Sequence, residues 1–151
     1  MEAGIQACPP INLKNMKIFL PVSIRGGREH LNIYKFIVEY LEKNGHQILN
    51  RHVIHDNVLE RENVLNPKEI HSRDKQWVKE SDIVISEVTM PSLGAGIELG
   101  YAIMLKKPTH ALYKKEAEND VSMMIRGNDK LLSYPYSNKK DIVKILNQIL
   151  K

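Results

Sequence analysis

The chain has 151 residues and a mass of 17.4 kDa, and 42% of its residues are hydrophobic and 26% charged. These values are typical of one globular domain, which at this length needs no cross-link to be stable. The single cysteine, Cys8, excludes an internal disulfide and a zinc site built from several thiolates. The net charge of +4 is a mild excess that fits a small anionic ligand without indicating one.

The first residues and the overall hydropathy argue against a membrane protein. No stretch reaches the roughly 18 consecutive apolar residues of a membrane-spanning helix. Residues 1–15 lack the apolar core of a signal peptide, and we expect them to be a poorly ordered extension of a domain over 16–151. The expected compartment is therefore reducing and cytoplasmic, or also nuclear in a eukaryote.

Short apolar runs alternate with helical periodicity along the chain. The pattern predicts strands over 17–22, 47–50, 82–88, 108–113 and 131–134, and helices over 31–44, 67–80, 95–106, 121–127 and from 138 onward. It predicts loops over 23–29, 51–66 and 114–120. This alternation implies right-handed crossovers and a parallel sheet. We therefore expect one doubly wound α/β domain, flavodoxin-like or Rossmann-like, with about five parallel strands.

In such a sheet, ligands bind beyond the carboxyl ends of the strands, which here are followed by residues 23–29 and 87–96. The first of these loops contains Gly26-Gly27 between Arg25 and Arg28 and precedes a predicted helix. Glycines let backbone N–H groups approach an anion closely, and an arginine fork suits a phosphate. The loop therefore favours phosphate binding, although a polar turn with solvated arginines fits the spacing equally well.

The second loop, Ser92-Leu93-Gly94, also opens a predicted helix. Ser92 can add a hydroxyl to the same anion, but its simplest role is a helix N-cap. Glycines at 94, 96 and 100 nearly match a dinucleotide fingerprint, but the third glycine of that motif would fall at Leu99. We therefore exclude a dinucleotide site.

Two carboxylates, Asp74 and Glu98, lie on helices predicted to border this edge of the sheet. Alone, Glu98 is explained by its place near a helix N-terminus, and Asp74 by a surface salt bridge. Together they match the pair that cleaves a glycosidic bond, where one carboxylate attacks the anomeric carbon and the other assists proton transfer. The spacing does not show whether they meet.

Other candidate chemistry is weak. His52 and His55 stand in a predicted loop without a metal-ligand motif, so we expect no metal. The lysines are scattered and aromatics make up only 6%, so a nucleic-acid platform is not expected.

Five segments in order resemble the 2'-deoxynucleoside 5'-phosphate N-hydrolases, relatives of the nucleoside 2-deoxyribosyltransferases. They are Ser23 to Glu29, Arg73 to Trp77, Ser86 to Gly94, Glu98 to Gly100 and Ser122 to Gly127. The resemblance covers about residues 16–150 and implies hydrolysis of a nucleoside 5'-monophosphate to free base and sugar 5-phosphate. It further implies a homodimer with shared active sites and no metal or organic cofactor. Neither a nucleic acid nor a membrane is an expected partner.

The resemblance also implies residue roles. Glu98 would be the nucleophile that forms a glycosyl-enzyme intermediate, and Asp74 its partner carboxylate. Ser122 and Met124 would reach the substrate from the neighbouring subunit. The implied substrate-binding residues are Phe19, Ser23, Ile24, Arg25, Gly26, Ser92, Gly94, Ser122 and Met124.

Phe19 departs from the family pattern, because members specific for deoxynucleotides carry tyrosine there. Phenylalanine leaves room for a 2'-hydroxyl, as in the family's cytidylate-cleaving branch. The hypothesis is that CMP or 5-hydroxymethyl-CMP is accepted. Two alternatives stay open: a nucleoside 2-deoxyribosyltransferase and a non-catalytic nucleotide-binding regulatory module.

Overall fold

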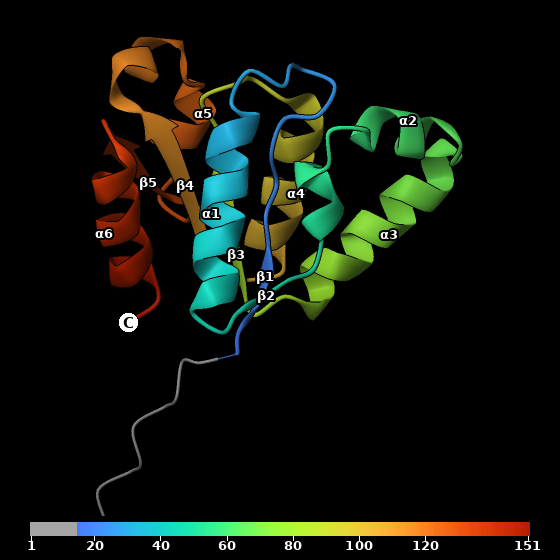
Figure 1. Cartoon of the computed structure of the whole chain (residues 1–151), viewed down its shortest axis with the longest axis horizontal. Coiled ribbons are helices and arrows are strands. Elements are labelled where there is room, and N and C mark those ends of the chain that lie inside the picture. The colour runs from blue at the N-terminus through green and yellow to red at the C-terminus, as the bar shows by residue number, and fades with distance from the viewer. Residues whose placement is uncertain (1–14) are drawn as a thin grey trace, which may run out of the picture.

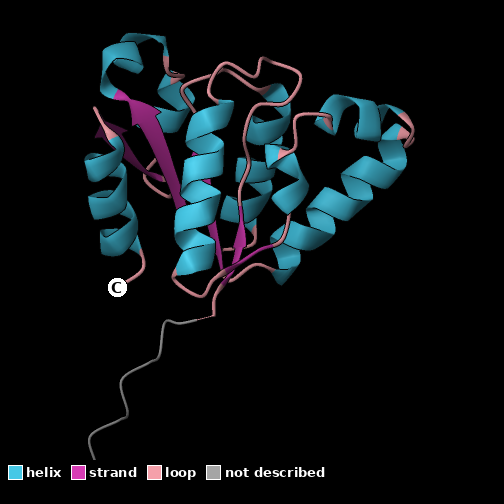
Figure 2. Ribbon diagram, viewed as in Figure 1, coloured by secondary structure: helices cyan, strands magenta, loops and turns pink. Residues whose placement is uncertain are grey.

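The computed structural model describes residues 15–151, so the extension predicted over 1–15 lies outside the described residues except for Asn15. Five parallel strands form one sheet in the order β2-β1-β3-β4-β5, and helices cover both faces (Figures 1 and 2). The predicted flavodoxin-like α/β architecture is confirmed. Among the described residues, no helix has the length and apolar composition needed to cross a membrane.

The strands are β1 (Lys17–Phe19), β2 (Gln47–Ile48), β3 (Ile83–Glu87), β4 (Thr109–Lys114) and β5 (Leu132–Tyr136). The α-helices are α1 (Leu31–Lys43), α2 (Val58–Asn63), α3 (Pro67–Glu80), α4 (Leu93–Met104), α5 (Met123–Arg126) and α6 (Lys139–Ile149). Two 3-10 helices, η1 (Arg51–Ile54) and η2 (Lys115–Asp120), complete the fold.

Side-chain alternation along the short strands builds two cores. Ile18 and Ile85 face the layer of α1 and α6, where they join the fully buried Tyr34 and Leu146. Their chain neighbours Phe19 and Val84 point to the opposite face of the sheet, because side chains alternate along a strand. There they pack with buried residues of α3 and α4. The two helices that carry Asp74 and Glu98 therefore rest on the same face of the sheet.

Local capping sets where the site-bearing helices begin. At α3, the Asn66 side chain accepts a hydrogen bond from the Glu69 N–H, the Glu69 carboxylate accepts one from the Asn66 N–H, and Pro67 occupies the first turn. At α4, the Ser92 hydroxyl accepts a hydrogen bond from the Ala95 N–H at 3.2 Å. Ser92 is thus an N-cap, the simpler of the two roles its sequence position allowed.

The loop predictions over 51–66 and 114–120 are wrong. The first segment contains η1 and α2, in which Val53, Ile54 and Val58 are buried, and the second is η2. Each of these helices spans only four to six residues, too few turns for a helical period to be visible in sequence. The omission matters because α2 forms one wall of the pocket described below.

β1 ends at Phe19, three residues before the predicted end. Beyond it, the side chain of Asn50 replaces the hydrogen bonds that a neighbouring strand would make to Leu20. Asn50 Oδ1 accepts a hydrogen bond from the Leu20 N–H at 2.9 Å, and Asn50 Nδ2 donates one to the Leu20 carbonyl at 2.8 Å. Both partners are buried. This amide thereby holds the chain as it leaves the sheet towards Ser23 and the pocket.

Replacing Asn50 with alanine should destabilise the domain, because it leaves both backbone groups of Leu20 buried without a partner. The expected loss is about 1–3 kcal/mol in the free energy of unfolding, measured by urea denaturation. Asn57→Ala is a matched control, since Asn57 is exposed and makes no side-chain cap bond. Equal urea midpoints for Asn50→Ala and the unchanged protein would contradict this account.

Candidate active site

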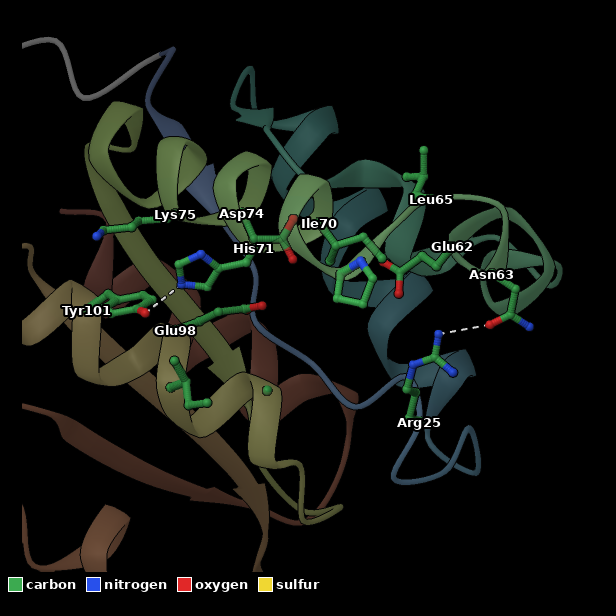
Figure 3. A pocket seen from close by; sticks show the side chains of 13 residues that line it. Arg25, Glu62, Asn63, Leu65, Ile70, His71, Asp74, Lys75, Glu98 and Tyr101 are labelled. Carbon is green, nitrogen blue, oxygen red and sulfur yellow. Dashed lines mark hydrogen bonds between the residues drawn. The ribbon is translucent and has the colours of Figure 1, made fainter.

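A cavity of about 500 Å³ opens between α2, α3, α4 and the loop after β1, at the carboxyl edge of the sheet. Figure 3 shows its walls, with Asp74 and Glu98 in the middle, Arg25 and Asn63 at one end, and His71 and Tyr101 at the other. The thirteen lining residues are Arg25, Glu62, Asn63, Leu65, Pro67, Ile70, His71, Asp74, Lys75, Gly94, Ile97, Glu98 and Tyr101.

Packing of α3 against α4 brings the two predicted carboxylates together. Asp74 lies in the middle of α3, and Glu98 lies in the second turn of α4. In Figure 3 both carboxyl groups extend into the cavity and lie beside one another. The sequence suggested this pair by residue type alone, and the contact between the helices supplies the proximity that spacing did not show.

Two carboxyls so close together cannot both ionise freely. Burial, and then the neighbouring Asp74 carboxyl, raise the pKa of Glu98 to about 8. A like charge at short range in a poorly solvated site has this effect because the second negative charge is strongly disfavoured. Near neutral pH the pair therefore holds one proton between its two carboxyls and behaves as a single coupled acid.

Asp74 is also tied to a cation. Arg73 Nε donates a hydrogen bond to Asp74 Oδ1 at 2.8 Å, and Arg73 NH2 donates one to Glu62 Oε1 at 3.2 Å. The guanidinium lies 4.8 Å from the ring centroid of Trp77. Although burial opposes its charge, hydrogen bonds to Asp74 and Glu62 raise the pKa of Arg73 above its usual range. The cation is therefore permanent and fixed in place.

The end of the cavity formed by Arg25 has the properties of an anion site. Arg25 is exposed, and its NH2 donates a hydrogen bond to Asn63 Oδ1 at 2.9 Å. Gly94, which also lines the cavity, lies in the first turn of α4, where the helix N-terminus favours negative charge. Gly26 joins the two loops, because any side chain at that position would collide with the Pro91 carbonyl.

Of the residues expected at the site, Arg25, Asp74, Gly94 and Glu98 line the cavity. The others do not: Phe19 and Ser23 are buried, Ile24 and Gly26 are the chain neighbours of Arg25, and Ser92 and Ser122 cap α4 and α5. The Ser23 hydroxyl is buried and makes no hydrogen bond within the described chain. Met124 is 81% exposed, which does not fit the simple packing role that its residue type suggests. The substrate contacts of all these residues stay predictions.

Sequence reasoning missed most of the cavity wall. Ile70, His71 and Tyr101 lie one turn from Asp74 or Glu98 on the same helix faces, so helical spacing from the two carboxylates could have identified them. His71 Nε2 and Tyr101 Oη are hydrogen-bonded at 2.7 Å and join α3 to α4. Glu62 and Asn63 gave no such indication, because the helix that carries them was predicted as loop.

Fold and cavity together define the class: a parallel α/β protein with a carboxylate pair beside an anion-binding end. The family model described as nucleoside 2-deoxyribosyltransferase matches residues 18–133. A 5-hydroxymethyl-dUMP N-hydrolase from Esox lucius is 43% identical over 115 residues, which cover 74% of this chain and 79% of the relative. A protein from Thermofilum pendens, provisionally named 2'-deoxynucleoside 5'-phosphate N-hydrolase 1, is 36% identical over 139 residues, covering 89% and 95%.

Among solved structures, the Clostridium botulinum CMP N-glycosidase BcmB has the same fold. It superposes with a TM-score of 0.62 at 22% identity, over 87% of this chain and 98% of that one. The chain therefore belongs to the nucleoside 2-deoxyribosyltransferase family, in the group of the 2'-deoxynucleoside 5'-phosphate N-hydrolases.

Proposed function

We propose that the protein hydrolyses the N-glycosidic bond of nucleoside 5'-monophosphates, releasing the free base and a sugar 5-phosphate. The observation that carries this proposal is the carboxylate pair of Asp74 and Glu98, which lines one cavity together with Arg25, a cation suited to a 5'-phosphate. The relatives named above as N-hydrolases of nucleoside 5'-phosphates support the same reaction.

In the first step, the ionised Glu98 carboxylate attacks the anomeric carbon. The bond from that carbon to the base nitrogen breaks, and its electron pair leaves with the base. As Glu98 attacks, the single proton of the pair passes by way of Asp74 to the departing base. This division suits a pair that carries one proton, because one member is a nucleophile while the other is an acid.

In the second step, water attacks the same carbon and releases Glu98 from the glycosyl ester. Asp74 is now ionised and accepts a proton from that water, so the pair returns to its starting state. Arg25, Gly94 and the nearby serines at 23 and 92 would hold the 5'-phosphate, which places the sugar over the carboxylates. Phosphate at this end favours monophosphates over unphosphorylated nucleosides.

We further propose that the active unit is a homodimer. One face of α4 exposes an apolar stripe of Leu93, Ile97 and Met104, with Leu93 92% exposed. Gly96 and Gly100 lie along that helix with open space before them, which lets a second helix approach closely. A stripe of this kind on a monomer marks an interaction surface. A second copy packed there would also give Ser122 and Met124, which do not line their own chain's cavity, a site to contact.

Glu98→Gln should abolish release of free base from every nucleoside and deoxynucleoside monophosphate tested, because the amide cannot form the glycosyl ester. Nucleotide binding, measured by calorimetry, should persist because the anion site is unchanged. Full activity in Glu98→Gln would contradict the assignment of the nucleophile. Binding without turnover by the unchanged protein would favour a regulatory module, and base exchange faster than hydrolysis would favour a transferase.

Phe19→Tyr should shift selectivity from ribonucleotides towards deoxynucleotides. Phe19 is buried in the cluster that contains Leu99, the residue after Glu98, so we expect an added hydroxyl to take space on the side of the sugar. The measurement is the ratio of kcat/KM for CMP to that for dCMP, with 5-hydroxymethyl-CMP as a third substrate. If the unchanged protein strongly prefers dCMP and the ratio does not move in the variant, ribonucleotide acceptance is wrong.

Met104→Glu should dissociate the homodimer, because it places a charge at the C-terminal end of the apolar stripe. Mass from light scattering should fall from two chains to one, and base release should fall with it. Leu132→Glu is a matched control, since Leu132 is also an exposed apolar residue but lies on the edge strand β5. A single-chain mass for the unchanged protein at micromolar concentration would exclude the dimer.

A further inference from the structure

One guanidinium serves two carboxylates at the rim of the active site. Arg73 donates through Nε to Asp74 and through NH2 to Glu62, so it bridges α3 and α2. Glu62 is only 6% exposed although it takes no part in the reaction proposed above. A carboxylate is seldom buried unless it is paired with a cation, and Glu62 is paired with Arg73, the same cation that holds Asp74.

Each element around Arg73 restricts its movement. Trp77, one turn further along α3, stacks under the guanidinium at 4.8 Å. His52 of η1 approaches both Glu62 Oε1 and Arg73 NH2 at 3.4 Å. Burial, and then the charge of Arg73, lower the pKa of His52, so this imidazole is neutral and adds no competing charge. From α4, Glu98 lies next to Asp74 (Figure 3).

We propose that Arg73 is a positioning residue of this site: anchored by Glu62, it holds one oxygen of Asp74 and turns the other towards Glu98 and the sugar. The inference rests on the proposed N-glycosidase function. It deepens that function by naming the residues that orient the acid of the pair. Arg73 itself touches no reacting atom.

The charges of this cluster act on Glu98 in opposite directions. Asp74 and Glu62 raise the pKa of Glu98, whereas Arg73 lowers it. Loss of the Arg73 charge should therefore make Glu98 harder to ionise, and loss of the Glu62 charge should make it easier. Because the first step transfers the one proton of the pair to the departing base, activity should fall as rising pH removes that proton, and the midpoint of this fall should move up in Arg73→Gln and down in Glu62→Gln.

The kinetic test measures kcat, KM and the pH dependence of kcat/KM with a nucleoside monophosphate that the unchanged protein cleaves. Arg73→Gln should lower kcat about 10- to 100-fold with little change in KM, because a misplaced acid affects chemistry more than binding. The alkaline limb of its pH profile should move up by about one pH unit. Arg73→Lys should keep the limb near its original position but recover kcat only in part, because an ammonium does not span both carboxylates.

A second measurement needs no activity. Carbon-13 NMR of the side-chain carboxyls in the free protein follows the Glu98 titration, which is assigned by its loss in Glu98→Gln. The midpoint should rise in Arg73→Gln and fall in Glu62→Gln. A purely structural role for the bridge would move both variants in the same direction or neither. Arg51→Gln is the matched control, because Arg51 pairs with Glu42 at 2.7 Å and does not line the cavity.

The two measurements separate the inference from the function. If the unchanged protein cleaves no monophosphate, the proposed function is wrong, and the NMR titrations still decide the role of Arg73. If the protein cleaves its substrate but Arg73→Gln keeps both the original kcat and the original Glu98 titration, Arg73 does not position Asp74 and the inference is overturned.

Discussion

Two carboxyl groups facing one another in a cavity impose the strongest constraint on this molecule. Each is costly to ionise beside the other, so the pair of Asp74 and Glu98 retains a proton that isolated carboxyls would lose near neutral pH. The arrangement is unfavourable for stability and favourable for chemistry, because it sets an acid beside a nucleophile. The surrounding structure contains features that hold the pair together: α3 packed on α4, the His71–Tyr101 bond and the Arg73 bridge.

The parallel sheet makes that arrangement accessible to a ligand. All five strands end at one edge, so the loops after β1 and β3 and the starts of the following helices converge there. Asn50 holds the chain after β1 by its backbone, and Gly26 permits the contact with Pro91 that joins the two loops. The cation at Arg25 is thus placed by contacts of the neighbouring backbone as well as by its own hydrogen bond to Asn63. This explains why a net charge of +4, spread over scattered lysines, says less about the ligand than one loop does.

Much of this was predictable from the sequence, and the failures share a cause. Strand and helix order, the cap at Ser92, the start of α3 at Pro67 and the two carboxylates followed from periodicity and residue type. What could not be predicted depends on short elements and on contacts between helices. α2 has six residues, too few for a helical period to be visible in the sequence, so Glu62 and Asn63 were missed with it. Arg73 stood within a recognised motif, but its role required knowing that α2 returns against α3.

The helix α4 links catalysis to assembly in the proposed dimer. One side of it carries Glu98 into the cavity, and the other exposes Leu93 and Met104. A helix is rigid over three turns, so a partner packed on the exposed side would fix the position of the nucleophile on the other. The glycines at 96 and 100 weaken the helix by roughly 1 kcal/mol each relative to alanine. Both positions face open space in the described chain, so no contact there requires a glycine. Close approach of a second chain would explain why glycines stand there. It would also make ionisation of the carboxylate pair depend on whether the dimer has formed.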